Sequence, residues 1–339
     1  MNVYYLPKSS FKRLLTCLVE SYDIYVLKEF SKNLYYNLLR KDELAGMENI
    51  ITDKLRAVQP LKSFFHLFAE DVTDLQKQKT GRIIIGAKAC DLNALSVMDR
   101  MFLEGDYRDG FYADKRDNTV IISGDCSEPD ENCFCTLLGN KPYPEKNFDL
   151  NVSASYDGYV IEVGSEKGEK LASENKSIFS FEAKRDLTEN RDEKRKKVIE
   201  TITGLNRDNK LKPGFFSDLP AKYDSGEWKK QSEPCVECGA CTMACPSCYC
   251  FLLAEVPDKN IFTRVKYQDS CQYSGYARVA GGATPRPSLY ERFRNRYYCK
   301  YEYRPGAIGL VACTGCGRCI AACQGGIDKR KVIAEITGK

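Results

Sequence analysis

Cys235-Val-Glu-Cys238-Gly-Ala-Cys241-Thr-Met-Ala-Cys245-Pro246 organises this chain, and Cys313-Thr-Gly-Cys316-Gly-Arg-Cys319-Ile-Ala-Ala-Cys323 repeats its pattern. Both have the spacing C-x2-C-x2-C-x3-C, which wraps cysteine thiolates around a cubane iron–sulfur cluster. In proteins with two clusters, the fourth cysteine of each run binds the cluster of the other run. The sequence therefore predicts two 4Fe-4S clusters. We expect one cluster on Cys235, Cys238, Cys241 and Cys323, and the other on Cys313, Cys316, Cys319 and Cys245.

Zinc is the alternative for these cysteines, because C-x2-C pairs also suit a tetrahedral zinc ion. A zinc site rarely needs the third and fourth spacings of each run, however. Two complete runs of four cysteines therefore favour iron–sulfur clusters.

The composition fits a globular protein of more than one domain. The chain has 339 residues, of which 43% are hydrophobic, and it contains 17 cysteines. A chain this long and charged is not a small disulfide scaffold, so the cysteines indicate metal ligands in a reducing, cytoplasmic compartment. Residues 1–25 lack the apolar core of a signal peptide, and we expect no membrane insertion.

The charge balance argues against a dedicated nucleic-acid binder, since the net charge is only +4. Basic residues do gather between Arg286 and Lys300. One interpretation is a solvated helix face. The other is a positive flank that eases the addition of electrons to anionic clusters or docks an acidic partner.

The first part of the chain has the pattern of an α/β domain. Phe11, Leu14, Leu15 and Leu18 have helical spacing, and residues 82–86 and 119–123 look like short buried strands. Residues 156–159 carry a hairpin signal. We expect Asp91 to cap the helix that follows the first buried strand. Residues 1–205 therefore read as a mixed α/β domain that ends in a charged surface helix.

The rest of the chain is expected to contain a linker and the cluster domain. Residues 206–234 are rich in proline and glycine and look like a linker. The two cysteine runs lie far apart, which leaves room for helices between them. The predicted fold class is α+β, in which residues 235–339 form a mainly helical, two-cluster ferredoxin-like domain.

Four cysteines of the first domain are candidates for a third cluster. Cys90 follows the first buried strand, and three more cysteines follow the second: Cys126, Cys133 and Cys135. If the two strands are neighbours, their carboxyl ends bring these thiols to one edge of the sheet. The alternative is inert buried thiols. Three cysteines in a short polar loop are poor core formers, which favours a possible third cluster.

The remaining cysteines and the single histidine have open or structural roles. Cys248, Cys250 and Cys271 could border a cluster, form a different third site, or act as redox-active thiols. Cys299 and Cys17 are interpreted as structural. His66 lies among phenylalanines, so packing is favoured over catalysis. No nucleotide-binding glycine motif follows a predicted strand, which indicates that electrons come from a partner.

Several stretches together resemble one family. They are Ala89-Cys90-Asp91-Leu-Asn-Ala-Leu, Cys133-Phe-Cys135, Cys245-Pro-Ser-Cys248-Tyr-Cys250-Phe, Asp269-Ser-Cys271, Ala280-Gly-Gly, Arg292-Phe-Arg-Asn-Arg296 and Cys316-Gly-Arg-Cys319. The chain resembles the β subunit of cytoplasmic sulfhydrogenase-type nickel–iron hydrogenases and the A subunit of anaerobic sulfite reductase. The segments 270–272 and 292–300 are closer to the hydrogenase branch. The chain departs from the family at Gln324, where the second run normally has a proline, and this leaves the local turn uncertain.

The resemblance implies an electron-transfer subunit with no active site of its own. Such a subunit relays electrons through clusters between a flavin-containing NAD(P)H subunit and a catalytic subunit. The catalytic centre would be a nickel–iron site or, as the alternative, a sirohaem. Two further hypotheses stay open: a cluster-based redox sensor that binds nucleic acid, and an enzyme with chemistry at an incompletely ligated cluster near Cys248, Cys250 and Cys271.

Overall fold

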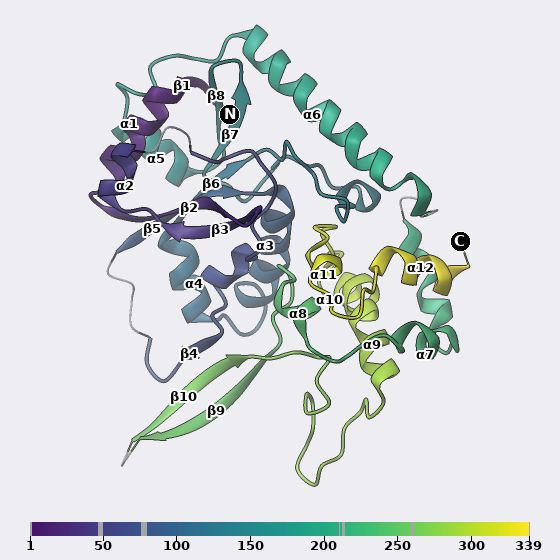
Figure 1. Cartoon of the computed structure of the whole chain (residues 1–339). Coiled ribbons are helices and arrows are strands. Elements are labelled where there is room, and N and C mark those ends of the chain that lie inside the picture. Colours follow the sequence, from purple (N-terminus) through teal and green to yellow (C-terminus); the bar gives the residue numbers. More distant parts are fainter. Residues whose placement is uncertain are drawn as a thin grey trace.

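A mixed seven-stranded sheet forms the centre of the first part of the chain (Figure 1). The computed structural model describes residues 2–46, 50–75, 80–209, 211, 214–258 and 261–338. The strand order is β1-β8-β7-β6-β5-β2-β3, with parallel pairing from β2 through β5 and β6 to β7 and antiparallel pairing elsewhere. The strands are β1 Val3–Pro7, β2 Tyr22–Phe30, β3 Asn33–Leu38, β5 Gly81–Ala87, β6 Thr119–Gly124, β7 Leu150–Ser155 and β8 Gly158–Val163.

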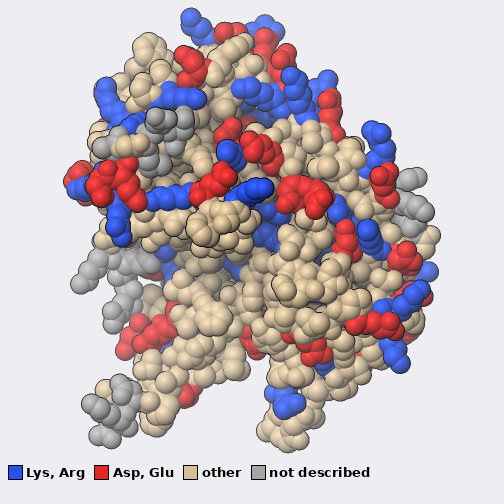
Figure 2. Space-filling model, in the orientation of Figure 1, with Lys and Arg blue, Asp and Glu red and all other residues tan. Residues whose placement is uncertain are grey.

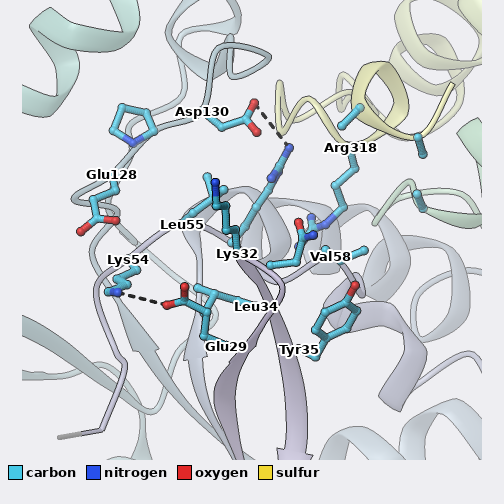
Figure 3. A pocket seen from close by; sticks show the side chains of 16 residues that line it. Glu29, Lys32, Leu34, Tyr35, Lys54, Leu55, Val58, Glu128, Asp130 and Arg318 are labelled. Atoms are coloured by element: carbon cyan, nitrogen blue, oxygen red, sulfur yellow. Dashed lines mark hydrogen bonds and ion pairs between the residues drawn. The ribbon is translucent and has the colours of Figure 1, made fainter. Parts of the chain in front are cut away.

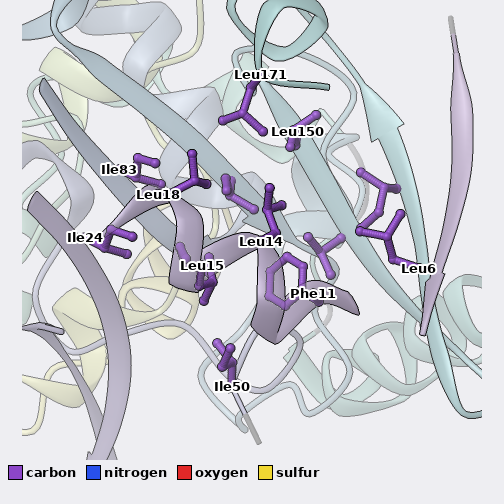
Figure 4. Packing of buried hydrophobic residues seen from close by; sticks show 14 of the residues in the cluster. Leu6, Phe11, Leu14, Leu15, Leu18, Ile24, Ile50, Ile83, Leu150 and Leu171 are labelled. Carbon is purple, nitrogen blue, oxygen red and sulfur yellow. The ribbon is translucent and has the colours of Figure 1, made fainter. Parts of the chain in front are cut away.

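Both faces of this sheet are buried, because successive side chains of a strand point to opposite faces. In β5, Ile83 and Ile85 pack in one hydrophobic cluster and Ile84 in another. The first cluster includes the buried face of α1 (Lys8–Leu18) and residues of α5 (Glu166–Glu174), as Figure 4 shows in part. The second includes α3 (Ala89–Phe102) and α4 (Gly110–Asp117). The first part of the chain therefore has the mixed α/β character that was predicted, and its elements form three layers.

The elements expected from the sequence are present, with one correction. The first helix, the strands β5 and β6, and the β7–β8 hairpin form where the patterns predict them. The expectation that Asp91 caps α3 is wrong. Lys88 occupies the cap position, and Asp91 is the third residue of the helix, in its first turn, where its carboxylate forms an ion pair with Arg318.

The charged stretch that follows forms the long helix α6 (Arg185–Leu205), which runs across the edge of the molecule (Figure 1). Its buried residues Val198 and Ile202 form a small cluster with Cys135. The helix therefore packs against the loop that carries the cysteines Cys133 and Cys135.

The last part of the chain has its own core around Trp228, which is fully buried. Phe215 and Leu219 from the predicted linker 206–234 join this core, together with residues of α9 and α12 such as Tyr297 and Ile333. The described residues Phe215, Leu219 and Trp228 of this segment thus pack against the cluster region. The helices here are α7 Glu227–Ser232, α8 Ala240–Met243, α9 Leu289–Tyr298, α10 Arg304–Ile308, α11 Arg318–Ala321 and α12 Lys329–Thr337, with a π-helical turn at Cys299–Tyr303.

A second, three-stranded sheet joins the two parts of the chain. Its strands are β4 (Ala69–Asp71), β10 (Ile261–Gln268) and β9 (Phe251–Asp258), in the order β4-β10-β9. The β9–β10 hairpin lies between the two cysteine runs in the sequence and projects from the molecule at the lower left of Figure 1. The expectation of a mainly helical carboxyl-terminal domain is therefore not confirmed, because a long hairpin forms part of the chain between the two runs.

Figure 2 shows Lys and Arg side chains interspersed with Asp and Glu over the visible face. Within the described ranges, no helix combines the length and the apolar character that crossing a bilayer requires.

Candidate metal centres

The first cysteine set, Cys235, Cys238, Cys241 and Cys323, lines one cavity of about 460 Å³. Gly239 holds the loop at φ 72°, a left-handed conformation that favours glycine, and α8 begins directly after it. The same turn recurs at Gly317, with φ 74°, before α11. Cys323 comes from the second run, so the structure brings together the four residues that the crossed arrangement predicts.

The second cysteine set is Cys245, Cys313, Cys316 and Cys319. Helices α8 and α11, which end near the fourth cysteine of each run, pack against each other. Burial raises the pKa of the Cys316 thiol to about 11, and the neighbouring thiols of Cys245 and Cys319 add to the shift while Arg318 and Arg56 oppose it. Tyr301 lies beside Cys313. Cys319 also lines the cavity of the first cysteine set, so the two sets adjoin.

The surroundings of these two sets suit an anionic, hydrogen-bond-accepting group. Arg296 is buried and lines the first cavity, and its Nε has no hydrogen-bond partner in the part of the chain that the structure describes. The same holds for the hydroxyl of the neighbouring Tyr297. Buried donors normally have partners. The sulfides of an iron–sulfur cluster would accept such hydrogen bonds, so the donor set fits the group.

The third cysteine set, Cys90, Cys126, Cys133 and Cys135, lines a cavity of about 360 Å³. Cys90 and Cys126 follow β5 and β6, which are parallel neighbours, so the carboxyl ends of these strands meet as the sequence predicts. Burial raises the pKa of the thiols of Cys126 and Cys135 to about 12. These thiols therefore stay protonated unless a metal displaces their protons.

Two buried cations line the third cavity. Lys88 donates from Nζ to the carbonyl oxygen of Asp125 at 3.1 Å and also to the carbonyl oxygen of Thr52. Arg56 donates from Nε to the carbonyl oxygen of Cys316. Buried positive charges beside four thiols suit a cluster with thiolate ligands, which is anionic. The alternative of inert core thiols does not explain why a lysine and an arginine share their cavity.

The second and third cysteine sets are neighbours. Gly315 and Cys316, from the second run, also line the third cavity. The backbone N–H of Phe134 donates to the carbonyl oxygen of Gly315 at 2.9 Å. A Cβ atom at Gly315 would lie 2.5 Å from the backbone of Cys135. Only glycine allows the two cysteine loops to approach this closely.

The variant Gly315→Ala is expected to lower the free energy of unfolding by about 1–3 kcal/mol more than Gly309→Ala, because overpacking adds to the backbone strain. Both glycines have positive φ, 69° and 71°, so both variants strain the backbone alike. Gly309 has open space around its Cβ position. Anaerobic denaturant unfolding compares the two variants. Equal losses of stability would show that the loops can separate without cost.

The interpretation of the basic stretch as a solvated helix face is wrong for three of its five basic residues, which are buried, whereas Arg286 and Arg294 are partly exposed. Arg292, Arg296 and Lys300 are each at most 6% exposed. They lie on α9 and the π-helical turn, and Lys300 and Arg296 point toward cysteines. Arg318 is likewise buried, so it is not a surface charge. The sequence showed that these residues are positively charged but did not show that they are buried. Helical spacing alone does not indicate which face of a helix lies against a metal site.

A wide groove without cysteines lies beside the second run. Figure 3 shows the Lys54–Glu29 ion pair at one end of the groove and Arg318 at the other. Ala244 and Ala322, each adjacent to the last cysteine of a run, form part of its lining. Small side chains here leave little protein between the groove and the cysteine runs.

The other predicted positions fall outside the three sets. Cys248, Cys250 and Cys271 line a further cavity together with Cys299. His66 is buried and packs against Phe102 and Phe251. Among the residues whose positions are described, no three or more His, Cys, Asp or Glu side chains surround a point as a single metal ion requires. The thiols of the first and third sets each line a shared cavity, whereas those of the second set line no single one among the residues that are described.

Comparisons with known proteins agree with this arrangement. Residues 234–327 match the model of the 4Fe-4S dicluster domain. The chain is 32% identical over 308 residues to the sulfhydrogenase 2 subunit beta of Pyrococcus furiosus, and the match covers 88% of each chain. No solved structure matches the chain.

Proposed function

The chain belongs to the family of sulfhydrogenase β subunits, and from this premise we propose that it is the iron–sulfur electron-transfer subunit of a hydrogenase-type complex. The similarity to the sulfhydrogenase subunit over nearly the whole chain carries this proposal. In its finer form, the proposal is a cytoplasmic relay between a flavin-containing NAD(P)H subunit and a nickel–iron catalytic subunit.

The contiguity of the cysteine sets supports a relay. The third cavity shares Cys316 with the second set, and the first cavity shares Cys319 with it. The proposed ligation follows the crossed arrangement, with a third cluster on Cys90, Cys126, Cys133 and Cys135. Clusters bound at these sets supply one-electron carriers in a continuous row.

The residues of the chain act by spacing, by excluding water and by charge. Arg296 at the first set and Arg56 and Lys88 at the third stabilise added negative charge, because they are fixed cations in a medium of low dielectric constant. Cys133, Cys135 and Cys316 are buried and all the other cysteines of the three sets except Cys238 are partly buried, which limits the access of water to the clusters they would hold. Fixed charge and exclusion of water are two means by which a protein adjusts the reduction potential of a bound cluster.

The β9–β10 hairpin supports assembly with another subunit. Its apolar side chains are exposed: Leu252 by 57%, Ile261 by 69% and Phe262 by 64%. Exposed apolar groups gathered on one projecting element are typical of surfaces that another protein covers. We propose that the hairpin contacts a partner subunit.

Anaerobic purification of the tagged chain from its source, followed by metal analysis, tests the function. We expect nickel to co-purify with the wild-type chain. The variant Leu252→Glu/Phe262→Glu should lose at least tenfold of the co-purified nickel while it keeps its iron, because charges disrupt an apolar contact. Phe181→Glu, which changes an exposed phenylalanine elsewhere, is the control. Sirohaem in place of nickel would assign the chain to a sulfite reductase. The absence of both nickel and sirohaem would contradict the proposal.

A further inference from the structure

Four cysteines outside the three sets line a cavity of their own. Cys248, Cys250, Cys271 and Cys299 surround it, together with the cations Arg296, Lys300 and Arg304. We propose that this cavity is a fourth iron–sulfur site and that these four residues, the fourth cysteine set, are its ligands.

The β9–β10 hairpin brings two of the four cysteines together. Cys250 precedes β9 and Cys271 follows β10, and Phe251 pairs with Gln268 at the base of the hairpin. The backbone N–H of Asp269 continues the ladder by donating to the carbonyl oxygen of Cys250 at 2.8 Å. The thiols of Cys250 and Cys271 lie within hydrogen-bond distance of each other. The hairpin thus closes one side of the fourth site.

Cys299 reaches the fourth site from an unusual turn. The α-helix α9 ends at Tyr298, and a π-helical turn occupies Cys299–Tyr303. A π-helical turn is rare and costs stability relative to a continued α-helix, and such turns occur frequently at functional sites. Here the turn places Cys299 and Lys300 next to each other on the wall of one cavity.

Buried lysines at the fourth site need a negative partner. Lys300 is 2% exposed, and its Nζ donates to the hydroxyl of Ser247 at 2.8 Å. The thiols of Cys245, Cys248 and Cys299 interact electrostatically with this ammonium group, and Cys248 and Cys299 line the same cavity. Lys62 is also 2% exposed and donates to the carbonyl oxygen of Cys248 at 2.7 Å. Burying an ammonium group is costly unless it is paired, and an anionic cluster with four thiolate ligands pairs it.

With the fourth set, nearly every cysteine of the chain is assigned to a proposed cluster. Four sets of four account for all 17 cysteines except Cys17, which is exposed on α1. The new site adjoins the others, because Arg296 lines both this cavity and the first, and Cys248 hydrogen-bonds to Cys245. A cluster here would exchange single electrons with its neighbours. All four proposed ligands belong to this chain, so the proposal does not depend on which catalytic subunit is the partner.

The test measures iron, acid-labile sulfide and zinc in the full chain after anaerobic expression with cluster-assembly proteins. We expect about sixteen iron atoms and a similar number of sulfides per wild-type chain, for four cubanes. The variant Cys250→Ala/Cys271→Ala should lose about four of each. Cys17→Ala, which removes the one thiol outside the sets, should lose none. Native mass spectrometry of the wild-type chain counts clusters directly, so the test does not depend on the folding of the variant.

Several results would overturn the fourth site. One is a fully loaded wild-type chain that holds three clusters and no heavier species. Another is unchanged iron in the double variant, or loss of zinc in place of iron. A third is a wild-type chain in which Cys250 and Cys271 form a disulfide and the double variant lacks only that bond. None of these results depends on nickel, so a failure of the fourth site is distinguishable from a failure of the proposed complex.

Discussion

The double variant Cys235→Ala/Cys323→Ala is expected to lose about four iron atoms, whereas Cys235→Ala/Cys245→Ala should lose about eight. The reason is that Cys323 lines the cavity of the first cysteine set, although it belongs to the second run. Under crossed ligation, the first pair damages one cluster and the second pair damages two. Iron and sulfide analysis, with electron paramagnetic resonance of the reduced chain, measures the losses.

The same two variants test the opposite arrangement. If each run held its own cluster, Cys235→Ala/Cys323→Ala would lose about eight iron atoms and Cys235→Ala/Cys245→Ala only about four. Cys17→Ala again serves as the control, since Cys17 is exposed and remote from the cysteine sets. The reversed pattern of losses would rule out the crossed ligation.

The parts of the structure that local patterns determine were predictable. Burial is continuous along most of β5 and all of β6, which requires both faces of the sheet to be covered, so the α/β layers follow from short apolar strands and an amphipathic helix. The cysteine spacings predicted the first two sets, and the expected neighbouring strands predicted the third; the structure brings the cysteines of the first and third sets to shared cavities. The match to the sulfhydrogenase subunit confirms the resemblance found in the sequence.

The parts that depend on long-range contacts were not predictable. The β9–β10 hairpin was missed because its strands are largely exposed and lack a clear polar–apolar alternation. Cys299 was interpreted as structural because nothing in its local sequence indicates that a π-helical turn places it opposite Cys250 and Cys271. Asp91 fitted the pattern of a helix cap, but its partner Arg318 lies at the other end of the chain.

Asp91 and Arg318 bind the second cysteine run to the sheet. Arg318 donates from an NH2 group to the Asp91 carboxylate at 2.8 Å, and from Nε to the carbonyl oxygen of Ala57 at 3.0 Å. The other oxygen of Asp91 accepts from the backbone N–H of Leu61 at 3.0 Å. The side chains of Asp91 and Arg318 are 0% and 2% exposed. This ion pair therefore lies in the interior, where an unpaired charge is costly.

Asp91→Ala is expected to lower the free energy of unfolding by about 3–5 kcal/mol, because it leaves the Arg318 guanidinium buried without its counter-charge. Anaerobic denaturant unfolding measures the loss. Glu145→Ala is the matched control, since it removes the carboxylate of an exposed ion pair with Lys141 and should cost at most about 1 kcal/mol. The pair Asp91→Leu/Arg318→Met should recover part of the stability, because apolar residues can replace a buried ion pair. If Asp91→Ala were no less stable than Glu145→Ala, the ion pair would not hold the second run against the sheet.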